Sequence, residues 1–179
     1  AELVMVANFT SAKDHSTVIT GISRMLDQGA DVRITFVGDG PLREKAELVV
    51  PTRFRDKFCF LGKRSDVDLI IRGCSIGILL NSPGHAEGMS NSVMEYMAAG
   101  MPVVCTAAGG NKELVENRET GYLVEHSSVT GLVEALTSLI NDPVGFASMG
   151  KAAKLKIEKN YSMEVMVQSY LRHYRALLA

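Results

Sequence analysis

The sequence has no excess of charge of either sign and no long hydrophobic run. Its 179 residues include 19 Lys and Arg against 20 Asp and Glu, which leaves a net charge of −1. Such a balanced chain shows no electrostatic sign of a nucleic-acid partner. No apolar run approaches the ~20 residues that span a bilayer, so no transmembrane segment is predicted. With 46% hydrophobic residues, the chain is not disordered as a whole.

Cysteine is also scarce. Cys59, Cys74 and Cys105 cannot all pair, and none belongs to a Cys-x-x-Cys motif. All three lie in or beside apolar runs, which favours buried free thiols in a reducing compartment over disulfides or metal ligands. The histidines are scattered without the spacing of metal ligands, so the sequence predicts no metal site.

Apolar runs of strand length alternate with helical patterns. The predicted strands cover 3–7, 32–37, 57–61, 75–80, 102–106 and 121–124. The predicted helices cover the stretch between Asp14 and Gly29, then 41–50, 65–73, 90–100, 111–116, 128–141, 143–159 and 163–178. Asp14 and Ser65 are predicted N-caps, and Pro41 is predicted to open its helix. The strand runs are continuously apolar, which is typical of strands covered on both faces.

This alternation predicts an α/β fold. Strands that alternate with helices imply right-handed crossovers and therefore a parallel sheet. We expect residues 1–179 to form a single, open, doubly wound domain of six strands with a helical C-terminal tail. The apolar stripe of the last helix must cover either this sheet or a partner domain absent from the chain. Ligands of such folds bind at the carboxyl ends of the strands.

The densest signal for a site lies in residues 81–115. A strand is followed by a loop containing Gly and Pro, and Glu87-Gly88 then leads into a helix that contains Glu95. The free N–H groups at a helix N-terminus suit a phosphate, and the two oxygens of a carboxylate match a ribose diol. Two glutamates eight positions apart can equally be a solvated pair, and the residues alone leave that alternative open.

The same segment resembles the signature of the retaining GT-B glycosyltransferases of the large "group 1" family. That signature contains Glu-Gly, a second Glu eight positions after the first, Ala-x-Gly-x-Pro-Val-Val and Gly-Gly-x-x-Glu. This chain has Glu87-Gly88, Glu95, residues 98–104 (AAGMPVV) and residues 109–113 (GGNKE). Residues 6–19, 34–47, 58–71 and the last helix also resemble family segments, so the likeness covers nearly the whole chain in order.

The resemblance implies a Rossmann-like domain, one half of a GT-B fold, that binds a nucleotide-diphosphate sugar. Glu95 would bind the ribose hydroxyls, and Glu87 would contact the sugar near its reacting carbon. Lys13 matches the family's basic residue on the diphosphate, which the helix N-terminus would also hold. The implied catalytic residues are Glu87 and Lys13, and the implied substrate-binding residues are Asn8, Lys13, Arg64, Glu87, Gly88, Met89, Ser90, Asn91 and Glu95.

Asn8 departs from the family pattern. The family usually has Arg at this position, five residues before the Lys. Asn donates a hydrogen bond but cannot neutralise phosphate charge, so the affinity for diphosphate is lower or another cation such as Arg64 contributes. Lys63 and Arg64 follow the third predicted strand, where the family places the wall of the base site, although plain surface charge is an equally good interpretation. His85 either reaches the sugar or caps its loop.

The resemblance also implies how the chain is used. It matches only the C-terminal, donor-binding domain, so the N-terminal acceptor domain is missing and the acceptor is unknown. We expect transfer of a hexose with retention, without a metal or other cofactor, by a cytoplasmic protein or one that is peripheral at a membrane through the missing domain. Polysaccharide biosynthesis is the expected setting, and this fragment alone is expected to be inactive. A non-catalytic sugar-nucleotide binding module and a GT-B-fold sugar-nucleotide epimerase are the alternatives.

Overall fold

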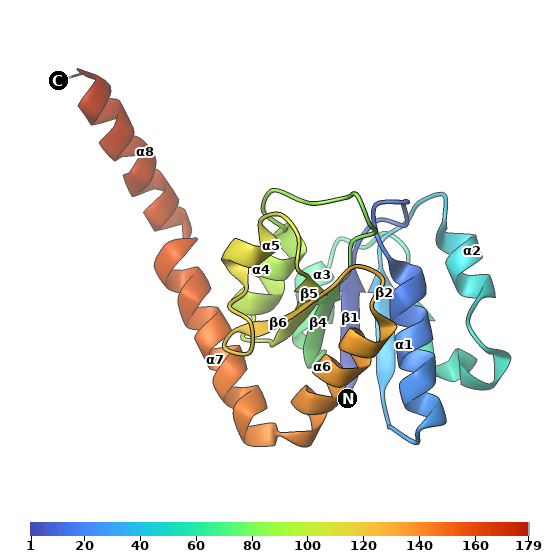
Figure 1. Ribbon diagram of the computed structural model, residues 1–179. Helices are drawn as coiled ribbons and strands as arrows, with labels where there is room; N and C mark the ends of the chain where they lie inside the picture. Colours follow the sequence, from blue (N-terminus) through green and yellow to red (C-terminus); the bar gives the residue numbers. More distant parts are fainter. Residues whose placement is uncertain (179) are drawn as a thin grey trace.

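The computed structural model describes residues 1–178, which form a six-stranded parallel sheet between two layers of helices (Figure 1). The strands lie in the order β3-β2-β1-β4-β5-β6. This is the doubly wound topology predicted from the alternating pattern, in which the chain reverses its direction of travel between β1 and β4. The strand bounds are β1 (Glu2–Val6), β2 (Arg33–Val37), β3 (Phe58–Phe60), β4 (Ile76–Leu79), β5 (Val103–Thr106) and β6 (Gly121–Val124).

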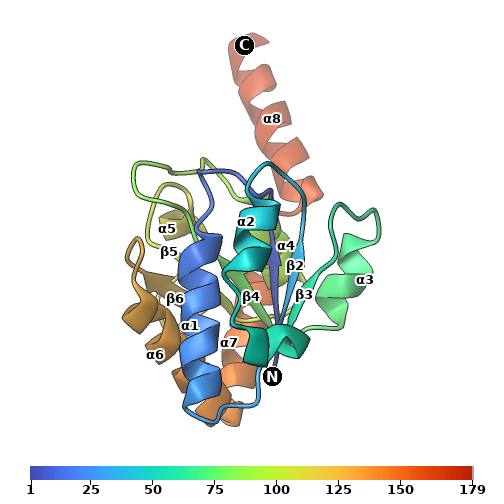
Figure 2. The same ribbon diagram turned by 90° about the vertical axis from the view of Figure 1, so that its right-hand side faces the viewer.

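The helices divide between the two faces of the sheet. On one face α1 packs beside α6, and on the other α4 packs against α7 (Figure 2). Their bounds are α1 (His15–Asp27), α2 (Arg43–Leu48), α3 (Val67–Arg72), α4 (Asn91–Ala98), α5 (Asn111–Leu114), α6 (Val129–Asn141), α7 (Pro143–Asn160) and α8 (Met163–Leu178), with a 3-10 helix at Thr52–Lys57.

The core lies on both sides of the central strands. Every residue of β4 and β5 is buried, as are Leu3, Val4 and Met5 in the middle of β1. The continuously apolar runs therefore form strands covered on both faces, as predicted.

Several helix ends confirm the local signals in the sequence. The carboxylate of Asp14 accepts the N–H of Thr17 at 2.9 Å and so caps α1. Gly29, two residues beyond the end of α1, has a φ of +85°, a conformation that glycine adopts at low cost. Pro143 occupies the first turn of α7 behind the cap residue Asp142.

Two predicted helix starts are wrong. Helix α2 begins at Arg43 rather than Pro41, because the chain turns at Gly40 and the N–H of Leu42 donates to the carbonyl of Phe9. Helix α2 also ends early, since Pro51 cannot continue a helix and is followed by the 3-10 turn. Helix α3 begins at Val67, so Ser65 is not its cap.

The prediction of three buried thiols is also wrong for one residue. Cys105 is buried in β5 and Cys74 is partly buried, but Cys59 is exposed. Cys59 lies on β3, an edge strand that turns the neighbouring side chain of Phe58 into the core. All three cysteines are free.

Helix α8 covers no other element within residues 1–178. It continues from α7 away from the sheet (Figure 1), and none of its residues is buried. Within residues 1–178, no helix combines the length and hydropathy that a membrane crossing requires.

Candidate functional site

A cleft of about 570 Å³ lies at the carboxyl ends of β1 and β2, against the N-terminus of α4. It is placed where the chain reverses between β1 and β4, which is the usual ligand position in open α/β sheets. The structure brings every predicted site residue to its walls, namely Asn8, Lys13, Arg64, Glu87, Gly88, Met89, Ser90, Asn91 and Glu95.

Lys13 reaches the cleft from the loop between β1 and α1. Backbone hydrogen bonds fasten this loop to the end of β4, from Asp14 N–H to the Leu80 carbonyl at 2.9 Å and from Ser82 N–H to the Ala12 carbonyl at 3.0 Å. The Lys13 side chain is only 13% exposed, and burial lowers the pKa of its ammonium. A desolvated cation on a fixed loop is a strong partner for an anion.

Lys13 forms an ion pair with Glu87, whose side chain is 30% exposed. Glu87 belongs to the 81–90 loop, which joins β4 to α4. The ion pair therefore joins two neighbouring loops that both line the cleft.

The 81–90 loop rests on Gly109 and Gly110. The N–H of Gly110 donates to the carbonyl of Glu87 at 2.9 Å. A Cβ atom at Gly110 would stand 1.4 Å from the carbonyl oxygen of Gly88, so only glycine allows this approach. Sequence reasoning read this Gly-Gly pair as part of a family signature and missed its role as the support of the 81–90 loop.

The N-terminus of α4 has no side-chain cap. Ser90 occupies the cap position, but its hydroxyl makes no capping bond to the first turn and lies 3.4 Å from that of Ser92. The first N–H groups of α4, from Asn91 onward, therefore stand at the cleft wall without a capping side chain. This is the arrangement that binds anions at helix N-termini.

Glu95 lies on α4 and lines the cleft. Burial raises the pKa of this carboxyl. Asn8, which follows β1, is exposed on the adjoining wall. His85 lies exposed in the 81–90 loop and is not among the residues that line the cleft.

Arg64 lines the cleft, but its guanidinium group is already paired with a carboxylate. Its Nε and one terminal nitrogen donate to the two carboxylate oxygens of Asp66, at 2.8 and 2.7 Å. This bidentate bond raises the pKa of Arg64 and lowers that of Asp66. Asp66 and Asp68 form an Asp-x-Asp pair, yet in residues 1–178 no three His, Cys, Asp or Glu side chains gather as a metal site would require.

Residues 1–142 match the family model described as "Glycosyl transferases group 1". The chain belongs to this family. It is 27% identical over 177 residues to N-acetyl-alpha-D-glucosaminyl L-malate synthase of Bacillus anthracis, a match that covers 98% of this chain and 45% of that protein. It is 30% identical over 142 residues to an uncharacterized glycosyltransferase of Haemophilus influenzae, covering 78% of this chain and 39% of the relative.

Solved glycosyltransferase structures share the fold. Anabaena Alr3699/HepE in complex with UDP matches with a TM-score of 0.89 at 20% identity, over 98% of this chain and 48% of that one. The C-terminal domain of the group 1 protein LpcC from Francisella tularensis matches with a TM-score of 0.78 at 22% identity, over 90% of this chain and 87% of that domain. The chain thus spans about half the length of the full-length relatives it matches.

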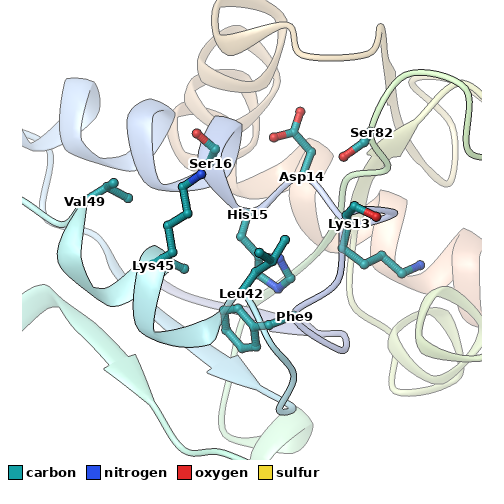
Figure 3. A pocket seen from close by; sticks show the side chains of 11 residues that line it. Phe9, Lys13, Asp14, His15, Ser16, Leu42, Lys45, Val49 and Ser82 are labelled. Atoms are coloured by element: carbon teal, nitrogen blue, oxygen red, sulfur yellow. The ribbon is translucent and has the colours of Figure 1, made fainter.

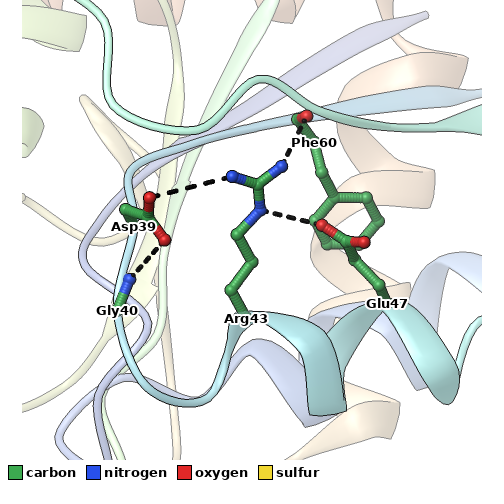
Figure 4. Close-up of polar contacts among 5 residues, drawn as sticks. All are labelled: Asp39, Gly40, Arg43, Glu47 and Phe60. Carbon is green, nitrogen blue, oxygen red and sulfur yellow. Dashed lines mark hydrogen bonds and ion pairs between the residues drawn. The ribbon is translucent and has the colours of Figure 1, made fainter.

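The turn after β2 forms part of the cleft wall through Gly38. A Cβ atom at Gly38 would stand 2.1 Å from the carbonyl oxygen of Ala7. Arg43 ties this turn to β3 (Figure 4): it lies 3.8 Å from Asp39, donates to Glu47 at 2.8 Å and donates to the carbonyl of Phe60 at 3.3 Å. Residues 38–40 therefore form a turn that is held against β1 and β3.

A second pocket of about 250 Å³ lies between α1 and α2, on the other side of Lys13 (Figure 3). Lys13 points away from His15 and Leu42 there. The ring of His15 stacks on Phe9 with 4.0 Å between centroids, and burial lowers its pKa to about 4. His15 is thus a neutral core residue near pH 7, and it buttresses the loop that carries Lys13.

Proposed function

We propose that the chain is the donor-binding half of a retaining hexosyltransferase that uses a nucleotide-diphosphate sugar. One observation carries this proposal: a single cleft gathers an uncapped helix N-terminus, a desolvated Lys13 and two carboxylates, Glu87 and Glu95. A nucleotide-diphosphate sugar presents a matching series of a ribose diol, a diphosphate and a sugar ring.

Each part of the donor has a partner in this scheme. The Glu95 carboxylate accepts hydrogen bonds from the ribose hydroxyls. Lys13 and the backbone N–H groups from Gly88 to Asn91 hold the diphosphate and stabilise the charge that develops on it as it leaves. Glu87 faces the sugar near its reacting carbon. The scheme requires no metal or other cofactor.

The other half of the site lies on the missing N-terminal domain. Because the chain spans about half the length of its relatives, we propose that it binds donor without transferring sugar on its own. The acceptor, which completes the reaction, would bind mainly to the missing half. Transfer by this chain alone would contradict this part of the proposal.

A non-catalytic sugar-nucleotide binding module is the second candidate. Asn8 favours it, because the family's usual cation is absent there and Arg64 is engaged with Asp66. Transfer activity of the full-length protein separates this candidate from the first.

The decisive experiment is a thermal-shift panel of UDP, GDP, ADP and their sugars. The solved relative HepE holds UDP, so UDP is the first probe. A ligand at ten times its Kd stabilises the chain by about 1.4 kcal/mol, which raises the Tm by roughly 3–6 °C at this size. We expect one base to give this shift and Glu95→Ala to abolish it. If no nucleotide shifts either this chain or the full-length protein, the proposed function is wrong.

A further inference from the structure

The ion pair between Lys13 and Glu87 occupies the part of the cleft that the proposed function gives to the diphosphate. Lys13 comes from the 8–14 loop, and Glu87 directly precedes Gly88 and the uncapped N-terminus of α4. A diphosphate held by Lys13 and these N–H groups would therefore lie beside a carboxylate. Like charges so placed repel each other, and this repulsion is strongest where solvent is partly excluded.

The charge of the diphosphate differs before and after transfer. In the reaction, the bond between the anomeric carbon and the terminal phosphate oxygen breaks, and its electron pair stays on that oxygen. The acceptor hydroxyl oxygen forms the new bond to carbon and gives up its proton to the leaving diphosphate or to water. Because the second ionisation of a phosphate has a pKa near 6, the free diphosphate carries about one more negative charge than the donor at pH 7.5.

We propose that Glu87 is a specificity-determining residue that makes the site reject the bare nucleoside diphosphate relative to its sugar-bearing form. The Glu87 carboxylate repels the extra charge of the product and competes with it for Lys13. Glu87 repels the donor less than the free diphosphate, because the sugar stands in place of the extra negative charge. The sugar hydroxyls also donate hydrogen bonds to the carboxylate. The same repulsion speeds release of the product. This inference rests on the proposed function.

Glu95 is the natural control for this effect. It lines the same cleft, but Glu87 belongs to the loop before α4, whereas Glu95 stands about one turn inside that helix, on the ribose side of the proposed ligand. It takes part in no ion pair within residues 1–178. Removing its charge affects donor and product alike, since both carry the same ribose.

The test compares three ligands of the base that the wild-type chain binds: the nucleoside diphosphate, its β-methyl ester and its sugar. The methyl ester has the charge of the donor without the sugar hydroxyls. Calorimetric titration at pH 7.5 gives the three Kd values for the wild type, Glu87→Gln and Glu95→Gln. Full-length protein is used if the chain alone binds too weakly to titrate.

We expect Glu87→Gln to tighten binding of the nucleoside diphosphate about tenfold relative to the methyl ester. Binding of the sugar nucleotide should weaken, while Glu95→Gln should weaken all three ligands by similar factors. A second variant pair, Lys13→Met with and without Glu87→Gln, separates release of Lys13 from direct repulsion, because the repulsion persists when Lys13 is gone.

The outcomes separate the two claims. If the wild type binds the nucleotides and Glu87→Gln leaves the ratio of diphosphate to methyl ester unchanged, the role of Glu87 is overturned and the proposed function stands. If neither the wild-type chain nor the full-length wild-type protein binds any of the three ligands, the role of Glu87 and the proposed function are both overturned.

Discussion

The hydroxyl oxygen of Tyr96 accepts the backbone N–H of Val6 at 2.6 Å. Tyr96 lies on α4 beside Glu95, and Val6 is the last residue of β1, two positions before Asn8. The bond is fully buried at the tyrosine, and burial also raises the pKa of the phenol. Gly77 on β4 makes room for the ring, since a Cβ there would stand 2.2 Å from a Tyr96 ring carbon. Tyr96 thus fixes α4 against the end of β1, where the two sides of the cleft meet.

Tyr96→Phe should destabilise the chain and weaken nucleotide binding together. The variant keeps the ring but leaves the N–H of Val6 buried without a partner, which costs about 1–3 kcal/mol. Urea denaturation measures the loss of stability, and calorimetric titration of the nucleotide measures the loss of affinity. Tyr122→Phe is the matched control, because it removes a hydroxyl from a half-buried tyrosine of β6 that makes no hydrogen bond within residues 1–178. Equal stability of wild type and Tyr96→Phe would contradict this account.

Gly110→Ala should displace the 81–90 loop. The added methyl group meets the Gly88 carbonyl oxygen at 1.4 Å, so the backbone that carries Glu87 and Gly88 must move. We expect affinity for the nucleotide to fall at least tenfold, because a helix N-terminus binds an anion only in the right geometry. In Gly73→Ala the nearest heavy atom lies 3.4 Å from the new Cβ, and this control should retain wild-type affinity.

The sequence predicts the fold and the residues of the cleft in part, because some of their features depend on local patterns and others on distant contacts. The strands and their parallel, doubly wound arrangement follow from the alternation of apolar runs with helices, and the cap at Asp14 follows from neighbouring residues. The contact of Tyr96 with Val6 joins positions 90 residues apart, so no local pattern indicates it. The exposure of Cys59 likewise depends on β3 being an edge strand. The ion pair between Arg64 and Asp66 depends on the conformation of the two side chains. The sequence therefore predicted which residues line the cleft better than how their charges are partnered.

The stability of the chain should fall between pH 7 and pH 5 because of His15. Burial lowers the pKa of His15 from 6.5 to about 4, so the unfolded chain binds a proton in this range that the folded chain does not. The free energy of unfolding therefore decreases as the pH falls, by about 2 kcal/mol between pH 7 and pH 5 from this residue. Urea denaturation at both pH values measures the decrease. In His15→Phe this part of the pH dependence should vanish, whereas replacement of the exposed His173 by Gln should leave it unchanged.

Removal of α8 should leave the domain as stable as the full chain. The helix presents a row of exposed apolar side chains, including Met163, Met166, Tyr170 and Tyr174, and contributes no buried residue to the core. A chain that ends at Ser162 should therefore keep its Tm within ~1 °C, since only exposed contacts are lost. A chain that ends at Asn141 should unfold at a much lower temperature, because it also loses Met149, Ala153 and Ile157, which α7 buries. A fall of several degrees on removing α8 alone would show that the helix folds back onto this sheet in solution. An unchanged Tm would show that its apolar stripe packs against nothing within this chain.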